Sequence, residues 1–213
     1  MKNSAYPGFL ITLEGGEGGG KTTQSVRLRQ KLIEEGKDVI VLREPGGTTI
    51  SEQIRQVVLS PENTGMAFTT EVLLFQAARA QIYREIVIPS LKAGKVVIMD
   101  RSRDSSVVYQ GMVRGFGKDL IDNLNDLSTD KIYPNITILL DLPVKTGLKR
   151  REESGKIDRL DMEALEFHQK VRDAYLQLAK ENNSGRWVIV DAQKPLKKVE
   201  EMIWQEVQKR IFK

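Results

Sequence analysis

The chain has 213 residues, of which 40% are hydrophobic, and this predicts a single domain, residues 1–213, with one well-buried core. It has no cysteine and a single histidine, His168, which excludes disulfides, thiolate zinc sites and imidazole-rich metal sites. The formal net charge is +4, but the basic residues are mostly scattered among acidic ones, which favours a solvated surface over one that binds nucleic acid.

Five short segments rich in β-branched and aliphatic residues recur between helical patterns, at residues 9–14, 38–43, 95–100, 135–141 and 186–191. They are apolar nearly throughout, as expected for strands of a parallel sheet covered on both faces. The alternation predicts an α/β fold, a doubly wound five-stranded parallel sheet flanked by helices. No apolar run reaches the length of a signal-peptide core or a membrane span, so we expect a cytoplasmic protein without membrane contact.

The first helical pattern, at residues 23–36, places Val26, Leu28, Leu32 and Ile33 at helical spacing, and Gly36 supplies its end. The spacing predicts a helix over this segment.

Charged residues close the strand segments, among them Glu14, Arg43, Asp100 and Asp141. In an open parallel sheet, ligands lie beyond the carboxyl ends of the strands. The pattern indicates a binding site at that edge of the sheet.

Residues 15–22 read GGEGGGKT and follow the first strand segment directly. They match the P-loop pattern, with Gly15, Gly20, Lys21 and Thr22 at its fixed positions. Such a loop lets backbone N–H groups converge on a phosphate at a helix N-terminus, while the lysine bridges the β- and γ-phosphates and the hydroxyl ligates Mg²⁺. The pattern predicts a P-loop NTPase type of fold that binds ATP and Mg²⁺. The expected ATP-binding residues are Gly15, Gly16, Glu17, Gly18, Gly19, Gly20, Lys21, Thr22 and Thr23. We expect Lys21 to be solvated when the loop is empty.

Two further segments favour a kinase. Asp100 ends the third strand close to the expected Mg²⁺, which makes Thr22 and Asp100 the candidate metal ligands, and Arg101 could clamp a second phosphate. An arginine-rich stretch with Arg150 and Arg151 predicts a lid near residues 147–160 that closes over the transferring group. A GTPase is disfavoured because no N-K-x-D element follows a late strand.

Together these motifs resemble the thymidylate kinase family, whose members phosphorylate dTMP with ATP to give dTDP and ADP in dTTP biosynthesis. The resemblance runs from Phe9 over essentially the whole chain. The segments that carry it are LEGGEGGGKTTQ, REPGGT, LLFQAARAQ, DRSRDSSVVYQG, GKIDRLD and FHQKVRDAYLQLA.

The resemblance implies how the base of dTMP is read. Phe75 would stack on thymine, and Arg79, four residues on along a helix, would donate to its O4. Ser106 and Gln110 would contact the base edge, where an amide oxygen can accept from N3–H. Tyr109 would form the wall beside the sugar C2′.

It also implies contacts to the rest of the nucleotide. Arg55 and Arg101 would clamp the dTMP phosphate, and Glu17 would lie near the 3′-hydroxyl. Glu44 and Pro45 would belong to the same site, joined by a cis peptide bond. A homodimer formed through helices near 48–59 and 69–93 is implied as well.

The family has branches, and Glu17 and Gly18 occupy positions where one of them carries an arginine. The chain resembles the bacterial type, in which the lid supplies the catalytic arginine. The implied catalytic residues are Lys21, Asp100, Arg101, Arg150, Arg151 and Arg159.

Three residues depart from the family pattern. Ser102 and Arg103 replace an aromatic residue or histidine after the Asp-Arg pair, which puts the wall near the phosphates in question. Asp161 stands in the lid where glutamate is usual, one methylene shorter. We expect neither departure to abolish activity.

Two alternatives remain open from the residues. One is a deoxynucleotide kinase of broader specificity with the same fold, which a comparison of rates on several nucleotides would separate. The other is a P-loop ATPase that binds DNA, which a DNA-stimulated ATPase assay would reveal.

Overall fold

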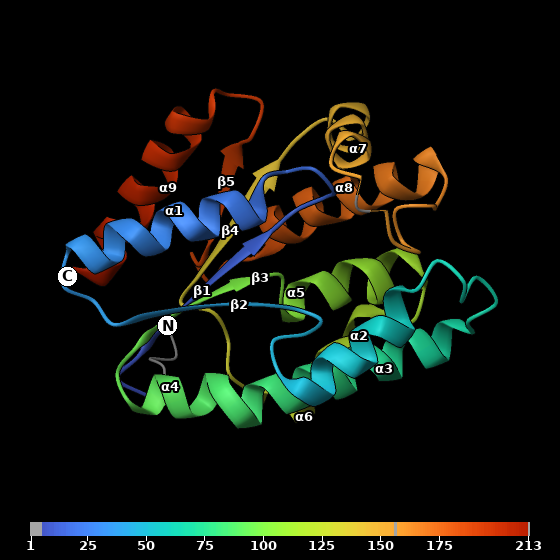
Figure 1. The fold of residues 1–213 in the computed structure, drawn as a ribbon, viewed down its shortest axis with the longest axis horizontal. Coiled ribbons are helices and arrows are strands. Elements are labelled where there is room, and N and C mark those ends of the chain that lie inside the picture. The colour runs from blue at the N-terminus through green and yellow to red at the C-terminus, as the bar shows by residue number, and fades with distance from the viewer. Residues whose placement is uncertain (1–5, 156, 213) are drawn as a thin grey trace.

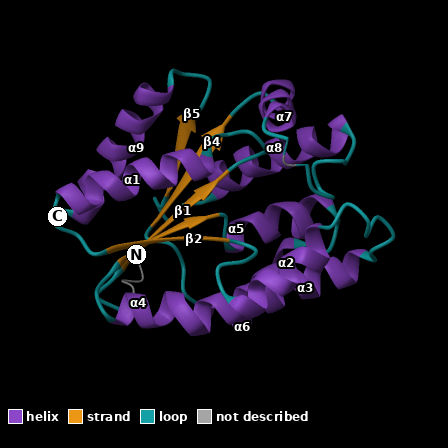
Figure 2. Cartoon of the chain, viewed as in Figure 1, coloured by secondary structure: helices purple, strands orange, loops and turns teal. Residues whose placement is uncertain are grey.

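A parallel sheet forms the centre of the computed structural model, which describes residues 6–155 and 157–212 (Figures 1 and 2). Within these residues its strand order is β2-β3-β1-β4-β5, and every neighbouring pair is parallel. The strands are β1 (Phe9–Glu14), β2 (Val39–Arg43), β3 (Val96–Asp100), β4 (Ile136–Asp141) and β5 (Trp187–Asp191). Each lies within one residue of its predicted segment, so the predicted fold class is confirmed. Residues 1–5, Lys156 of the predicted lid and Lys213 lie outside the described residues.

Helices connect the strands and cover the sheet. The helices are α1 (Lys21–Glu34), α2 (Thr49–Leu59), α3 (Phe68–Ile82), α4 (Ile88–Lys92), α5 (Arg103–Ser106), α6 (Lys118–Thr129), α7 (Val144–Glu153), α8 (Leu165–Glu181) and α9 (Leu196–Ile211), with π-helical turns η1 (Tyr83–Val87) and η2 (Val107–Val113). None of the helices in the described part of the chain has the length and apolar character needed to cross a membrane.

One face of the sheet is covered by α1 and α9, which lie side by side (Figure 1). Leu28 and Leu32 of α1 are buried there with Ile203 of α9, in contact with the strands. The predicted helix is present, but of its four regularly spaced apolar side chains Val26 is 59% exposed and Ile33 is also exposed. The apolar side chains of α1 extend around more of the helix surface than the sheet and α9 cover.

The opposite face is covered by a continuous run of helix, from α3 through η1 to α4, and by η2 and α8. Tyr83 and Val87 of η1 pack on Leu10 and Val97 of the strands. Parallel strands buried on both faces account for the uninterrupted apolar runs in the sequence.

The glycine-rich loop follows the central strand β1, which has β2 and β3 on one side and β4 and β5 on the other. In such sheets the ligand binds at the point where the strand order reverses. Gly18 has φ of +65°, and a Cβ there would collide with the backbone carbonyl of Gly147 in α7. A Cβ on Gly147 would in turn collide with the carbonyl of Glu17. Both positions require glycine, and their contact holds the start of the predicted lid against the loop.

Candidate active site

A cavity of about 450 Å³ opens at the carboxyl ends of the strands. It brings together residues that are up to 143 positions apart in the chain, from Glu17 in the glycine-rich loop to Leu160. The predicted site residues that line it are Glu17, Gly18, Gly19, Gly20, Lys21, Thr22, Thr23, Glu44, Pro45, Arg55, Phe75, Arg79, Asp100, Arg101, Ser106, Tyr109, Gln110, Arg150 and Arg151. Three predicted residues do not line it: Gly15, Gly16 and Arg159.

Lys21 begins α1, directly after Gly20, whose φ is +86°. Its ammonium Nζ donates to the backbone carbonyls of Gly16 at 2.7 Å and Gly15 at 3.1 Å. The side chain is buried, so the expectation of a solvated lysine in the empty loop is wrong. The loop itself supplies the hydrogen bonds that water would otherwise make. Burial, together with the charge of Arg101, lowers the pKa of Lys21.

Two side-chain oxygen atoms that could bind a metal ion lie close together beside this lysine. Thr22 Oγ1 donates to Asp100 Oδ2 at 2.6 Å, which joins the first turn of α1 to the end of β3. The described residues contain no cluster of three or more His, Cys, Asp or Glu side chains arranged for a metal. A hydroxyl and one carboxylate nevertheless suit Mg²⁺, which binds in kinases through few protein ligands plus water and phosphate oxygens.

Arg101 follows Asp100 in a left-handed conformation with φ of +66°, rare for a residue other than glycine. Its guanidinium donates to the Gly15 carbonyl at 3.0 Å and to Glu17 Oε1 at 2.5 Å. It also lies over the ring of Tyr109, 5.3 Å from the centroid. Although burial acts to raise the pKa of Glu17, Arg101 and Lys21 lower it to about 2. The loop is thus tied to β3 through a fixed pair of opposite charges.

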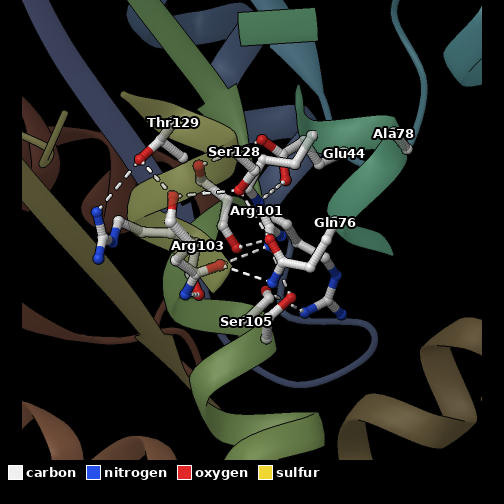
Figure 3. A network of polar contacts seen from close by, with 12 residues as sticks. Glu44, Gln76, Ala78, Arg101, Arg103, Ser105, Ser128 and Thr129 are labelled. Atoms are coloured by element: carbon white, nitrogen blue, oxygen red, sulfur yellow. Dashed lines mark hydrogen bonds and ion pairs between the residues drawn. The ribbon is translucent and has the colours of Figure 1, made fainter. Parts of the chain in front are cut away.

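Arg79 of α3 is almost completely buried, at 2% exposure, and forms an ion pair with Glu44 at 2.7 Å between Nε and Oε2. Its Nη1 atom donates to Ser106 Oγ and to Asn125 Oδ1 of α6, each at 2.8 Å, and Nη2 donates to the Ser102 carbonyl. Figure 3 shows the dense polar network to which Glu44 belongs. One N–H of Nη2 has no acceptor among the described residues, so it is available to a ligand.

Phe75, Tyr109 and Gln110 line one part of the cavity wall. Phe75 is half-buried with part of its ring in the cavity, so it is not an ordinary core aromatic. The Tyr109 hydroxyl donates to Glu17 Oε1 at 3.0 Å, and Gln110 Nε2 donates to Glu71 Oε1 at 2.8 Å. The wall therefore offers one aromatic face and one amide oxygen.

The loop after β2 and the helix α2 carry the remaining predicted contact residues. The Glu44–Pro45 peptide bond is cis, as the resemblance implies. Arg55 of α2 donates through Nη1 to the Pro45 carbonyl at 2.8 Å. Burial and the nearby positive charge of Arg43 lower the pKa of Arg55.

The unusual pair after Arg101 does not enter the cavity. Ser102 is fully buried, and its backbone N–H donates to Glu14 Oε1 at 2.9 Å. The Arg103 guanidinium points toward Thr129 (Figure 3), donates to Asp126 at 2.8 Å and stacks on Tyr133 with 3.6 Å to the ring centroid. Neither residue lines the wall near the phosphates.

The lid arginines face different ways. Arg150 and Arg151 line the cavity, and Arg151 is held by Asp161 at 2.8 Å and Asp158 at 3.1 Å. The shorter acid at position 161 therefore reaches Arg151. Arg159 instead points into the protein, where Nη2 donates to the buried Glu71 at 2.6 Å, so it has no place on the cavity wall.

Sequence reasoning missed three polar side chains around the site: Asn125, Glu71 and Ser105. Ser105 lines the cavity and donates to Glu14 Oε2 at 2.6 Å. Burial, together with the charge of Asp104, raises the pKa of Glu14 to about 7. Ser105 lies within the DRSRDSSVVYQG segment, but Asn125 and Glu71 lie in segments whose sequence carries no recognisable motif.

The family model described as thymidylate kinase matches residues 13–203. The chain is 46% identical over 194 residues to the thymidylate kinase of Geobacillus sp. (strain WCH70), covering 90% of this chain and 92% of that protein. It is 46% identical over 210 residues to that of Geotalea uraniireducens (strain Rf4), covering 96% and 98%.

A solved structure agrees. The crystal structure of thymidylate kinase from Ehrlichia chaffeensis matches with a TM-score of 0.77 and 32% identity, over 94% of this chain and 99% of that one. The phosphate loop, the buried Arg79 and the family matches lead to one conclusion: this chain belongs to the thymidylate kinase family.

Proposed function

We propose that the cavity transfers the γ-phosphoryl group of ATP to dTMP, giving dTDP and ADP for dTTP biosynthesis. The observation that carries the proposal is that one cavity joins the phosphate-binding loop to a wall that can recognise a pyrimidine base. Phosphoryl transfer depends on positioning and on neutralising charge, and both are supplied by side chains in this cavity.

On the acceptor side, Phe75 stacks on thymine and the free N–H of Arg79 donates to O4. Gln110 accepts from N3–H through Oε1, because its Nε2 is already used by Glu71. Ser106 supports the base edge and Tyr109 lies beside C2′. Support comes from the placement of all five side chains on the cavity wall.

The remaining contacts hold the sugar and phosphate of dTMP. Arg55 and Arg101, which both line the cavity, clamp the phosphate, and Glu17 lies near the 3′-hydroxyl. Glu44 and Pro45 complete this end of the site. The positive pair suits a phosphate dianion, which a guanidinium can bind in a bidentate way.

On the donor side, the loop from Gly15 to Thr23 holds the ATP phosphates, and Lys21 moves from its two carbonyl partners onto the β- and γ-oxygens. Thr22 and Asp100 would hold Mg²⁺, which when bound neutralises charge on the phosphate oxygens. Arg150 and Arg151 of the lid, residues 147–160, stabilise the transferring group. We do not assign this role to Arg159.

We also propose that residues 1–213 form one cytoplasmic domain that pairs as a homodimer. Exposed apolar side chains on α2 and α3, including Val57, Phe68 and Leu73, support an interface there. Mass photometry or light scattering at micromolar concentration should give twice the chain mass, and a monomer would contradict the dimer.

A product assay tests the activity. Purified protein, Mg²⁺ and ATP labelled in the γ-phosphate should yield labelled dTDP when dTMP is added, with little free phosphate. The rival DNA-binding ATPase predicts release of free phosphate that rises with added DNA and no labelled nucleotide product.

A further inference from the structure

Glu71 lies behind the cavity wall, in the first turn of α3, with its side chain fully buried. Three donors converge on it: Gln110 Nε2 at 2.8 Å, Arg159 Nη2 at 2.6 Å and Arg114 Nη2 at 3.5 Å. It does not line the cavity itself, but Gln110 does.

The carboxylate can only accept hydrogen bonds, so the side of Gln110 that faces it must be the NH₂ group. This holds whichever way the two similar ends of the amide are assigned. Gln110 is 2% exposed, and no hydrogen bond among residues 6–155 and 157–212 uses its Oε1. By binding the NH₂ group, Glu71 therefore leaves Oε1 of Gln110 as the hydrogen-bond acceptor that faces the cavity.

We propose that Glu71 is a positioning residue for base specificity, which acts by fixing the direction of the Gln110 amide. This rests on the proposed function, in which Gln110 reads N3 of the base. Thymine and uracil present N3–H as a donor, whereas cytosine presents N3 as an acceptor. An amide held with Oε1 outward accepts from the first two and repels the third.

The guanidinium of Arg159 explains why the orientation is stable. It joins the lid region to Glu71 and keeps one carboxylate oxygen occupied, while Gln110 takes the other. Arg159, expected from the family pattern to act on phosphate, thus supports base reading from behind the wall.

The substitution Glu71→Gln tests the proposal because it should reverse the amide. Arg159 can only donate, so the new side chain must turn its oxygen to Arg159 and its NH₂ group to Gln110. Gln110 then presents its oxygen to residue 71 and its NH₂ group to the base. We expect the ratio of kcat/KM for dTMP to that for dCMP to fall at least about tenfold, with dTMP losing most.

Glu163→Gln is the matched control. Glu163 also accepts from Arg114, at 2.5 Å, but has no contact with Gln110. It should leave the ratio unchanged within about twofold. The proposal is overturned if Glu71→Gln lowers kcat/KM for both nucleotides by the same factor, since a merely structural role predicts that result.

Two further variants complete the test. In a Gln110→Ala background, adding Glu71→Gln should change the ratio no further, because the amide through which Glu71 acts is gone. Glu71→Asp keeps an acceptor-only group, so it should preserve the ratio even if Glu71→Gln does not fold; a collapsed ratio in this variant would refute the proposal. If the parent protein makes no dTDP, the proposed function fails before Glu71 is tested.

Discussion

Arg101 and Glu17 form an ion pair, with Nη2 and Oε1 2.5 Å apart, that joins the end of β3 to the phosphate-binding loop. Both side chains are 16% exposed, so water screens the pair only weakly. Tyr109 donates to the same Glu17 oxygen, which extends the link to η2. A single acidic side chain thus connects the loop, the predicted phosphate clamp and the wall that we assign to the sugar.

The ion pair predicts a dependence of stability on acid. The folded pKa of Glu17 is about 2, below the value of 4.5 that it has when unfolded. Its stabilisation is complete above pH 4.5 and is lost as pH falls toward 2, because the unfolded chain then binds the extra proton. Between pH 6 and pH 3 the parent should lose about 2 kcal/mol more than Glu17→Gln does. Urea unfolding at both pH values measures this, and equal losses would show that the pair does not stabilise the fold.

Lys21 should be essential for transfer. Lys21→Met removes the charge that we assign to the β- and γ-phosphates, and kcat should fall at least about a thousandfold. Because Lys21 is buried and donates to two carbonyls, the free energy of unfolding should also drop by about 1–2 kcal/mol. Arg29→Met, at an exposed position of the same helix, is the control. If Lys21→Met is folded as well as the parent and its turnover is within about tenfold of the parent's, residues 15–22 do not act as a P-loop.

The Arg79–Glu44 pair predicts strong coupling between two substitutions. Arg79→Ala leaves a buried carboxylate without its partner and should cost about 3–5 kcal/mol of stability. The double variant Arg79→Ala with Glu44→Gln removes both charges and should be more stable than Arg79→Ala alone. Chemical denaturation of the variants decides this. If the losses in free energy of unfolding of the two single variants add up to that of the double variant, the two side chains are not energetically coupled.

Arg151 should act mainly on the chemical step. It lines the cavity from α7 and is held in place by Asp158 and Asp161. Arg151→Ala should lower kcat at least about a hundredfold with little change in KM for dTMP. Lys149→Ala, at an exposed position of the same helix, should leave both constants near the parent values. A rise in KM with unchanged kcat would assign Arg151 to ground-state binding instead.

The fold was accessible to sequence reasoning because a parallel sheet buried on both faces leaves uninterrupted apolar runs. All five strands were located within one residue for this reason. The core face of α1 was less accessible. Val26 and Leu28 are both apolar and close in sequence, but only Leu28 meets a covering element, and that depends on where α9 packs.

The site was accessible where its residues belong to local motifs. Lys21, Thr22 and Asp100 could be predicted as site residues because a glycine-rich loop, a helix start and a strand end each have a sequence pattern only a few residues long. Contacts between distant segments were not accessible. Asn125 lies 46 residues from Arg79, and Glu71 lies 88 residues from Arg159, so only the folded chain shows that each pair meets.

The most direct test of the account is the efficiency of the purified protein on dTMP, dUMP and dCMP with ATP and Mg²⁺. Loss of the thymine methyl from an apolar contact costs about 1–3 kcal/mol, so dUMP should be used roughly tenfold to a hundredfold less efficiently. dCMP should be at least about a thousandfold worse than dTMP, because its amino group faces the donor-only Arg79 and its N3 offers no hydrogen to Gln110. We expect kcat/KM to fall in the order dTMP, dUMP, dCMP. Turnover of dCMP as efficient as that of dUMP would contradict it.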